Sequence, residues 1–209
     1  VHDDNGKPFY EGMSGLWCTS LGFSEPELVT AAIDQFNQLP FYHSFAGKTV
    51  GPAIDLAEHL INIAPPAAGG STFSKAFFCS SGSEANDTAM KMVWYYQAAR
   101  GKPEKRKIIS RRRGYHGVTM AAASMTALAY AQNGFGLPLD FVKHTITPDY
   151  YNECRDGESE AEFTARCAAE LEALIIEEGP ETVGALFAEP VMGAGGVIIP
   201  PAGYFAAIR

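Results

Sequence analysis

The sequence predicts an α/β fold in which helices flank a mainly parallel sheet, with an N-terminal appendage outside that layer. From residue 76 to residue 209, short apolar runs alternate with helical stretches, an order that is typical of a parallel sheet. The run at residues 183–188 is apolar without alternation, as expected for a strand covered on both faces. Residues 1–50 lack this pattern, so we predict an N-terminal segment over 1–50 and a larger domain over 51–209.

The N-terminal segment contains a turn signal followed by a helix. Asn5 and Gly6 favour a hairpin turn between two short strands. Ser24 and Glu27 have the spacing of a capping box, in which each side chain bonds the other residue's backbone N–H. We therefore predict a helix that begins after Ser24 and ends before Pro40.

Helical and strand patterns alternate through the rest of the chain. Apolar residues recur at helical spacing in stretches that begin near Pro52, at about residue 83 and at about residue 160. Short apolar runs predict strands at residues 76–79, 107–110, 141–145 and 183–188. Glu162 and Arg166 lie one helical turn apart, so we expect them to form a favourable pair.

Composition and charge exclude several classes of function. The chain has 209 residues, of which 46% are hydrophobic and 19% are charged, as in ordinary soluble globular proteins. The net charge of −8 disfavours nucleic-acid binding through a basic surface, because such a protein repels phosphates. No apolar run approaches the roughly 20 residues needed to cross a bilayer, so no membrane partner is expected.

The cysteines indicate a cytoplasmic protein without a metal site. They form no CxxC pair, and no nearby histidine completes a zinc pattern. Their apolar or mixed surroundings are typical of reduced cytosolic thiols in a core. The four positions are Cys18, Cys79, Cys154 and Cys167.

Residues 78–86 have the chemistry of a phosphate-binding loop. An apolar run leads through Ser81, Gly82 and Ser83 into a helix. The free N–H groups and the dipole of a helix N-terminus favour an anion, and Gly82 lets the backbone approach it closely. The loop lacks the P-loop lysine and the G-x-G-x-x-G pattern, which disfavours a nucleoside triphosphate or a dinucleotide. The alternative is an ordinary helix N-cap.

Residues 114–117, Gly-Tyr-His-Gly, form a second candidate ligand segment after the strand at 107–110. The glycines permit a sharp turn that leaves the ring of Tyr115 free to stack on a flat heterocycle. The alternative is a turn that only covers the sheet. The three arginines at 111–113 are interpreted as a solvated edge.

Glu189 stands directly after the strand predicted at 183–188. Ligands of parallel sheets bind in the crevice beyond the carboxyl ends of the strands. The loops after the strands at 76–79 and 107–110 would share that edge. The three segments together therefore predict one ligand site at this edge of the sheet.

Together these segments resemble the class III aminotransferases, which are pyridoxal-phosphate-dependent enzymes of fold type I. Three motifs carry the resemblance in the family's order: Ser-Ser-Gly-Ser-Glu-Ala-Asn at 80–86, Tyr-His-Gly at 115–117 and Glu-Pro-Val at 189–191. Gly-Leu-Trp at 15–17 and Leu-Pro-Phe-Tyr at 39–42 look like the branch that acts on ω-amino acids and amines, often with pyruvate. The resemblance covers essentially the whole chain and implies an incomplete large domain of this fold.

The resemblance implies a role for each matching residue at the cofactor. Tyr115 would stack on the pyridine ring with His116 beside it, and Glu189 would lie near the polar edge of the ring. The cofactor phosphate would be bound by Ser81, Gly82 and Ser83.

The resemblance also implies a substrate pocket and a homodimer. Trp17 and Val118 would line the pocket for the amine or ω-amino acid donor and the keto acid acceptor. Phe45 would reach the site of the neighbouring subunit.

Two residues of the family's pattern are expected downstream of Arg209. They are the Asp that pairs with the pyridine nitrogen and the Lys that forms the Schiff base, which holds the cofactor aldehyde and moves the proton. None of the eight lysines here stands in a matching context. With Val1 in place of Met and a helix interrupted at Arg209, the sequence indicates the N-terminal portion of an enzyme, inactive alone.

Three functions stay open at this point. The first is transfer of an amino group from an amine or ω-amino acid to a keto acid, with pyruvate favoured over 2-oxoglutarate. The second is a non-catalytic binding or assembly module of the same fold, which the missing Lys and Asp favour. The third is an aminomutase or decarboxylase that uses the same cofactor.

Overall fold

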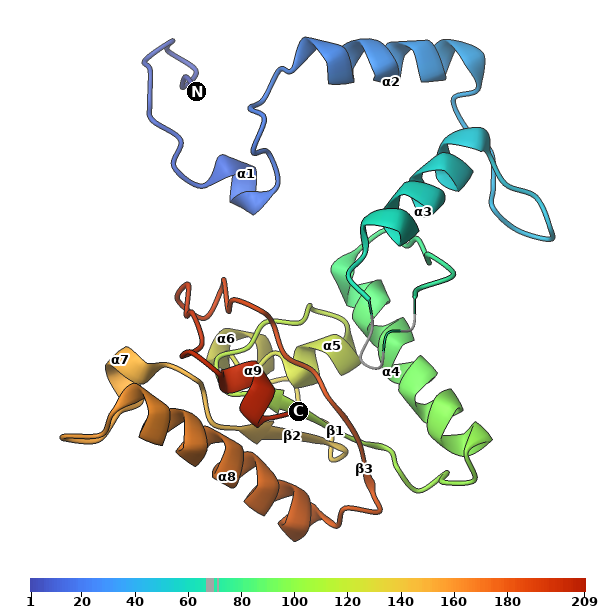
Figure 1. Ribbon diagram of the computed structural model, residues 1–209. Helices are drawn as coiled ribbons and strands as arrows, with labels where there is room; N and C mark the ends of the chain where they lie inside the picture. The colour runs from blue at the N-terminus through green and yellow to red at the C-terminus, as the bar shows by residue number, and fades with distance from the viewer. Residues whose placement is uncertain (67–69, 71) are drawn as a thin grey trace. The chain divides into compact units, whose positions relative to one another are not determined.

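The computed structural model describes residues 1–66, 70 and 72–209 (Figure 1). The chain divides into two compact units, Val1–Ala76 and Phe77–Arg209. We call them the N-terminal unit and the C-terminal unit. The division at residue 50 concerns the domains of a complete enzyme and stays a prediction.

The N-terminal unit consists of a turn and helices. The predicted turn is present, since Asn5 and Gly6 lie within the loop closed by an isolated antiparallel bridge between His2 and Pro8. The two short strands expected on either side of the turn do not form, because the pairing is limited to this single bridge. Gly6 has a φ of +79° there, a conformation that glycine adopts without steric cost. The helices are α1 (Ser14–Trp17), α2 (Pro26–Gln38) and α3 (Gly51–Ile63).

The predicted capping box of α2 is wrong by one residue. The N-cap is Glu25, whose carboxylate accepts a hydrogen bond from the backbone N–H of Glu27. Pro26 follows at the first helical position. Proline has its φ preset for a helix and no N–H to satisfy, so it defines the first turn. The cap therefore moves from Ser24 to the residue directly before the proline.

The C-terminal unit contains the predicted parallel sheet. Its strands are β1 (Lys107–Arg111), β2 (Val142–Thr145) and β3 (Val183–Leu186). Their order is β2-β1-β3, and β1 pairs with both neighbours in parallel. The predicted α/β class is thus confirmed, with a sheet whose three strands match three of the predicted runs.

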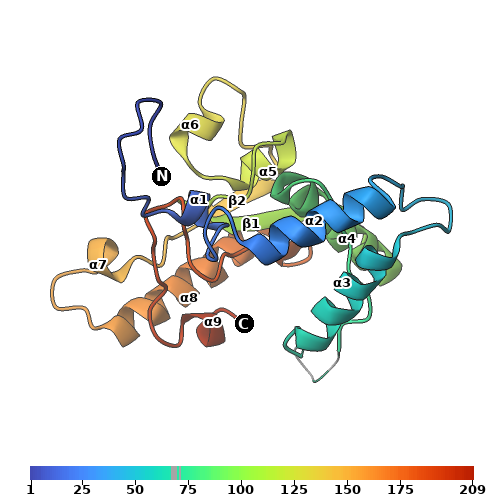
Figure 2. The ribbon, with the colours of Figure 1, turned by 90° about the horizontal axis from the view of Figure 1, so that it is seen from above.

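Helices cover this sheet on two sides. Figures 1 and 2 both place β1 and β2 between α5 and α8. One core cluster joins Met90 of α4 to Ile108 and Met125, and a second joins Phe163 of α8 to Tyr204 of α9. The helices are α4 (Gly82–Ala99), α5 (Met120–Met125), α6 (Ala129–Gln132), α7 (Tyr150–Glu153), α8 (Glu160–Glu178) and α9 (Tyr204–Ala207).

The strand predicted at residues 76–79 does not form. The segment has no strand assignment, and Phe77 and Phe78 are 70% and 47% exposed. A strand exists only where a neighbour accepts its ladder hydrogen bonds. No described strand of the sheet pairs with this segment, so its apolar residues stay in a connection without regular secondary structure that leads into α4.

The N-terminus of α8 also differs from the expected side-chain pairing. Ser159 and Glu162 form a capping box, with the Glu162 carboxylate 2.9 Å from the Ser159 backbone nitrogen. Glu162 therefore points back to the cap. Arg166 pairs instead with Glu158 at 2.8 Å and Glu170 at 3.3 Å.

The cysteines are all free, and only Cys167 is buried, while Cys18, Cys79 and Cys154 are exposed. The expectation that they pack as core residues is thus wrong for three of them. Within the part of the chain that the structure describes, no helix is long and apolar enough to cross a membrane.

Candidate cofactor site

The N-terminus of α4 presents backbone donors that are free to bind an anion. Ser81 is the N-cap, and its hydroxyl accepts a hydrogen bond from the Glu84 N–H at 3.2 Å. The Glu84 carboxylate in turn accepts from the Ser80 N–H at 2.8 Å. This reciprocal capping leaves the N–H groups of Gly82 and Ser83 without a partner among the described residues. The ordinary N-cap at Ser81 and an anion site are therefore compatible with each other.

The hydroxyl of Ser83 links α4 to the turn at 114–117. Its oxygen accepts a hydrogen bond from the Val118 N–H at 3.0 Å. A hydroxyl has one proton to donate besides its acceptor sites. Ser81 and Ser83 both accept from backbone, so both can donate that proton to an anion at the helix N-terminus.

Side chains satisfy the backbone donors of this turn. The Tyr115 N–H donates to Glu189 Oε1 at 3.1 Å. The N–H groups of His116 and Gly117 both donate to the hydroxyl of Thr126, at 2.7 and 3.2 Å. These hydrogen bonds fix the backbone of the turn, while the Tyr115 ring stays partly exposed.

His116 is buried and neutral at physiological pH. Burial, with smaller effects of Arg111 and His144, lowers the pKa of His116 to about 4. Its Nε2 lies 4.0 Å from Glu189 Oε1. Because the imidazole is neutral, the two groups are close but do not form an ion pair. The Asn86 side-chain amide donates to the His116 carbonyl at 2.6 Å.

Glu189 follows β3 and is half-buried at the same sheet edge. Burial raises the pKa of its carboxyl, while the Tyr115 N–H and the Arg111 charge oppose that rise. The three predicted segments therefore meet in this unit, because Ser83 contacts Val118 and Glu189 contacts Tyr115.

The three arginines do not form the solvated edge that the sequence suggested. Arg111 is 0% exposed, donates to the Glu189 carbonyl and lies over the Tyr204 ring at 5.7 Å. It is the last residue of β1, where the sheet and α9 enclose it. Arg113 is tied to Asp149 at 2.8 Å. Arg112 is exposed, as expected.

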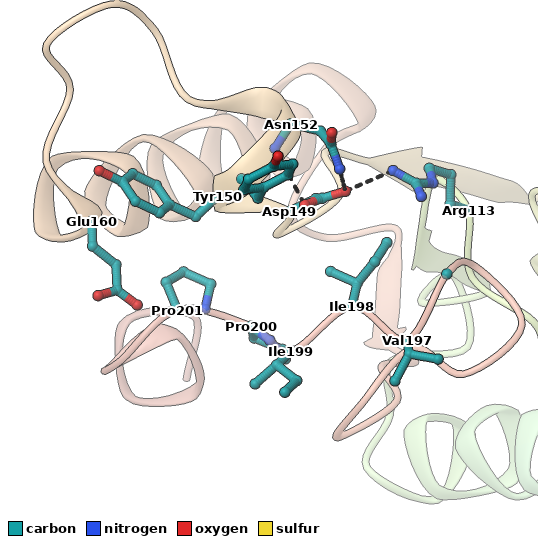
Figure 3. Close-up of a pocket in the computed structure, with 12 residues that line it drawn as sticks. Arg113, Asp149, Tyr150, Asn152, Glu160, Val197, Ile198, Ile199, Pro200 and Pro201 are labelled. Carbon is teal, nitrogen blue, oxygen red and sulfur yellow. Dashed lines mark hydrogen bonds and ion pairs between the residues drawn. The ribbon is translucent and has the colours of Figure 1, made fainter.

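A separate pocket of about 480 Å³ lies beside the Arg113–Asp149 pair. Figure 3 shows this pair and the hydrogen bond from Asn152 to Asp149 at one end of the pocket, with the segment 197–201 along its wall. None of the predicted site residues is among those that line it.

Trp17 and Phe45 belong to the N-terminal unit, where their side chains are 58% and 79% exposed. Their place in a substrate pocket stays a prediction, as does that of Val118, which is exposed in the C-terminal unit.

Sequence reasoning missed the support given by Asn86 and Thr126. Asn86 ends the motif at 80–86, which is a usable signal, whereas no motif pointed to Thr126.

The comparisons with known proteins agree with this arrangement. The chain matches the family profile described as aminotransferase class-III over residues 1–209. It is 50% identical over 209 residues to a protein named gamma aminobutyrate transaminase 3, chloroplastic, from Solanum lycopersicum, covering 100% of this chain and 39% of that protein. It is 52% identical over 205 residues to a vanillin aminotransferase from Capsicum annuum, covering 98% of this chain and 44% of that protein.

Solved structures of the same kind share the fold. An omega transaminase from Pseudomonas jessenii in complex with PMP superposes with a TM-score of 0.95 at 53% identity, covering 100% of this chain and 45% of that one. The chain thus spans less than half the length of these relatives. Class III aminotransferases use pyridoxal phosphate. On its fold, its motifs and its match over all 209 residues, the chain belongs to the class III aminotransferase family.

Proposed function

We propose that the protein containing this chain transfers an amino group from an amine or ω-amino acid to a keto acid by means of pyridoxal phosphate. One observation carries the proposal. The hydrogen bond between Ser83 and Val118 joins an anion-ready helix N-terminus to the turn that carries Tyr115. A phosphate and an aromatic ring of one ligand can therefore be bound side by side.

The residues present fit this cofactor. The acceptor oxygens of a phosphate match the donors at this helix N-terminus. These donors are the N–H groups of Gly82 and Ser83 and the hydroxyl protons of Ser81 and Ser83. When bound, the cofactor stores the electron pair that is released when the substrate loses a proton. The polypeptide's task is to orient it, and the partly exposed ring of Tyr115 is positioned to cover a heterocycle.

Glu189 and His116 complete the proposed ring environment. Glu189 Oε1 is fixed by the Tyr115 N–H, so its carboxylate has a defined position relative to the ring of Tyr115. His116 is neutral and buried, so it adds no positive charge beside a ring whose own charge matters to the chemistry.

The names of the relatives guide the proposed substrates. They include gamma aminobutyrate and vanillin aminotransferases and omega transaminases. We place the amino donor in this ω-amino acid and amine class and the acceptor as pyruvate. Trp17, Phe45 and Val118 are the residues we assign to the substrate pocket.

A polypeptide of residues 1–209 alone should not catalyse the reaction, because none of its lysines near the sheet is placed to bind the cofactor. The lysines near the sheet contact other groups, since Lys107 and Lys143 pair with Glu178 at 2.8 and 3.2 Å. Lys105 donates to the carbonyls of Pro180 and Val183. These contacts lie where the strands begin, at the edge opposite Tyr115.

A homodimer and a cytoplasmic location complete the proposal. The helices of the N-terminal unit contain no buried residue, and Leu28, Ile33 and Phe36 of α2 are each more than half exposed, so this apolar face is available for contact with the rest of the protein or with a second subunit. One relative is named chloroplastic and another mitochondrial. Cell fractionation would distinguish these organelles from the cytoplasm as the location of this protein.

The proposal is tested with the protein expressed from its complete gene. The purified protein should bind pyridoxal phosphate with a new visible absorption band and convert pyruvate to alanine with an ω-amino acid or amine donor. Equal failure with pyruvate and 2-oxoglutarate as acceptors would contradict the assignment to the ω-amino acid and amine branch. A bound cofactor with amino-group migration or carbon dioxide release would identify an aminomutase or a decarboxylase.

A further inference from the structure

We propose that Thr126 is a positioning residue of the cofactor site, with Asn86 as its partner, and that both act through the turn at 114–117. The inference rests on the proposed function, because it concerns how the polypeptide prepares a site for pyridoxal phosphate. Neither side chain needs to touch the cofactor. Each instead fixes backbone that carries the ring of Tyr115 on one side and contacts Ser83 on the other.

The hydroxyl of Thr126 uses its full hydrogen-bonding capacity on this turn. It accepts from the N–H groups of His116 and Gly117 at 2.7 and 3.2 Å and donates to the Gly117 carbonyl at 3.0 Å. A hydroxyl offers one donor and two acceptor sites, so nothing is left over. Thr126 is 0% exposed, and water cannot replace these bonds.

Asn86 fixes the same turn from the other side. Its side-chain amide donates to the His116 carbonyl at 2.6 Å. Asn86 lies on the first turns of α4, the helix whose N-terminus is the proposed phosphate site. The two side chains therefore set the distance between the phosphate site and the turn from both ends.

The turn at 114–117 packs closely against α4, so a shift of the turn changes its distance from the phosphate site. Gly117 has a φ of +125°, and a Cβ built on it would lie 2.9 Å from the Ser83 Cα and closer still to the Ser83 hydroxyl. The turn thus rests directly on α4. If the Thr126 bonds are lost, Gly117 and Val118 shift, and the Ser83 hydroxyl loses the N–H that orients it.

The test measures pyridoxal phosphate affinity of the protein from its complete gene. Thr126→Val keeps the volume and removes the hydroxyl, and Thr126→Ser restores it. Thr126→Val should raise the dissociation constant of pyridoxal phosphate about tenfold or more, because two buried N–H groups lose their acceptor. It should also weaken the visible circular dichroism of the bound cofactor, while Thr126→Ser stays near wild type in both readouts.

Thr147→Val is the matched control. Thr147 is 3% exposed, and its hydroxyl donates to the Arg112 carbonyl at 2.7 Å, so its loss tests stability without touching the turn. The control should lower the melting temperature and leave the affinity within about twofold of wild type. Equal affinity of Thr126→Val and wild type, or equal loss in Thr147→Val, would overturn the proposal.

Two further arms keep the outcomes separate. If Thr126→Val does not fold, Asn86→Ala replaces it, because Asn86 is only half-buried on α4. The same pyridoxal phosphate affinity is measured, and an affinity equal to that of wild type overturns the inference. If wild-type protein itself does not bind pyridoxal phosphate, the proposed function fails, and the inference fails with it. If wild type binds and the variants bind equally, only the inference fails.

Discussion

The hydroxyl oxygen of Ser83 accepts a hydrogen bond from the backbone N–H of Val118 at 3.0 Å. This bond joins the first turn of α4 to the loop that follows β1, two segments that lie 35 residues apart. It also leaves the hydroxyl proton of Ser83 available for an anion. One small side chain therefore connects the phosphate site to the ring-stacking site.

Ser83→Ala removes both functions of this hydroxyl. The dissociation constant of pyridoxal phosphate should rise about tenfold, since a hydrogen bond to a charged group contributes roughly 1.5–3 kcal/mol. The measurement is an equilibrium titration of the cofactor-free protein. Ser159→Ala is the matched control, because it removes an N-cap on α8 and about 1 kcal/mol of stability far from the site. A similar loss of affinity in both variants would refute the assigned role of Ser83.

Gly117→Ala should be far more damaging than Gly101→Ala. Both residues have a positive φ, of +125° and +73°. A Cβ at Gly101 meets nothing within 4 Å, whereas at Gly117 it meets the backbone of Ser83 at 2.9 Å. We expect a loss of about 1–2 kcal/mol for Gly101→Ala and about 3 kcal/mol or more for Gly117→Ala. Denaturant unfolding measures both, and equal losses would argue against the close contact.

Acidification should destabilise the protein through His116. Its pKa is lowered to about 4 by burial, while an unfolded histidine has a pKa near 6.5. Between these values the unfolded state binds a proton that the folded state does not, so the free energy of unfolding falls as the pH falls. The loss from this residue between pH 7 and pH 5 is about 2 kcal/mol.

His116→Gln isolates this effect. The variant should show a pH dependence between pH 7 and pH 5 that is smaller by about 2 kcal/mol, measured as the free energy of unfolding in urea. His144, whose pKa burial also lowers, keeps contributing in the same direction in both proteins. Carboxylates such as Glu158, with a pKa of about 2, lose their contribution only at lower pH. An unchanged slope would contradict the buried, neutral state of His116.

Lys143→Met should leave transamination intact. Lys143 lies on β2 and pairs with Glu178, which also binds Lys107. Loss of a partly exposed ion pair costs at most about 1 kcal/mol, so a small drop in melting temperature is expected. The assay is the turnover of the protein from its complete gene. Loss of the cofactor's absorption band and of all turnover would instead identify Lys143 as the catalytic lysine.

Local patterns predicted most of the C-terminal unit. The helix expected from about residue 160 to 178 is α8 (Glu160–Glu178), because Ser159 provides a strong N-cap and Gly179 ends the helix. Strands also form within the runs predicted at 107–110, 141–145 and 183–188, although β2 begins at Val142 and β3 ends at Leu186. These features depend on nearby residues, which a sequence displays directly.

The features that were missed depend on residues distant in sequence. The run at 76–79 has the composition of a strand but no described neighbour to pair with. Arg111 looked like a surface charge, yet it is buried by Tyr204, which lies 93 positions later. Thr126 carries no motif, and its role is visible only from its contacts with His116 and Gly117. Tertiary contacts of this kind leave no local signal.

A crystal structure of the complete protein with pyridoxal phosphate would show where the phosphate binds. We expect phosphate oxygens within about 2.7–3.2 Å of the Gly82 and Ser83 backbone nitrogens, with the Tyr115 ring stacked on the pyridine ring. A phosphate bound elsewhere, for example in the pocket beside Arg113 and Asp149, would contradict this expectation.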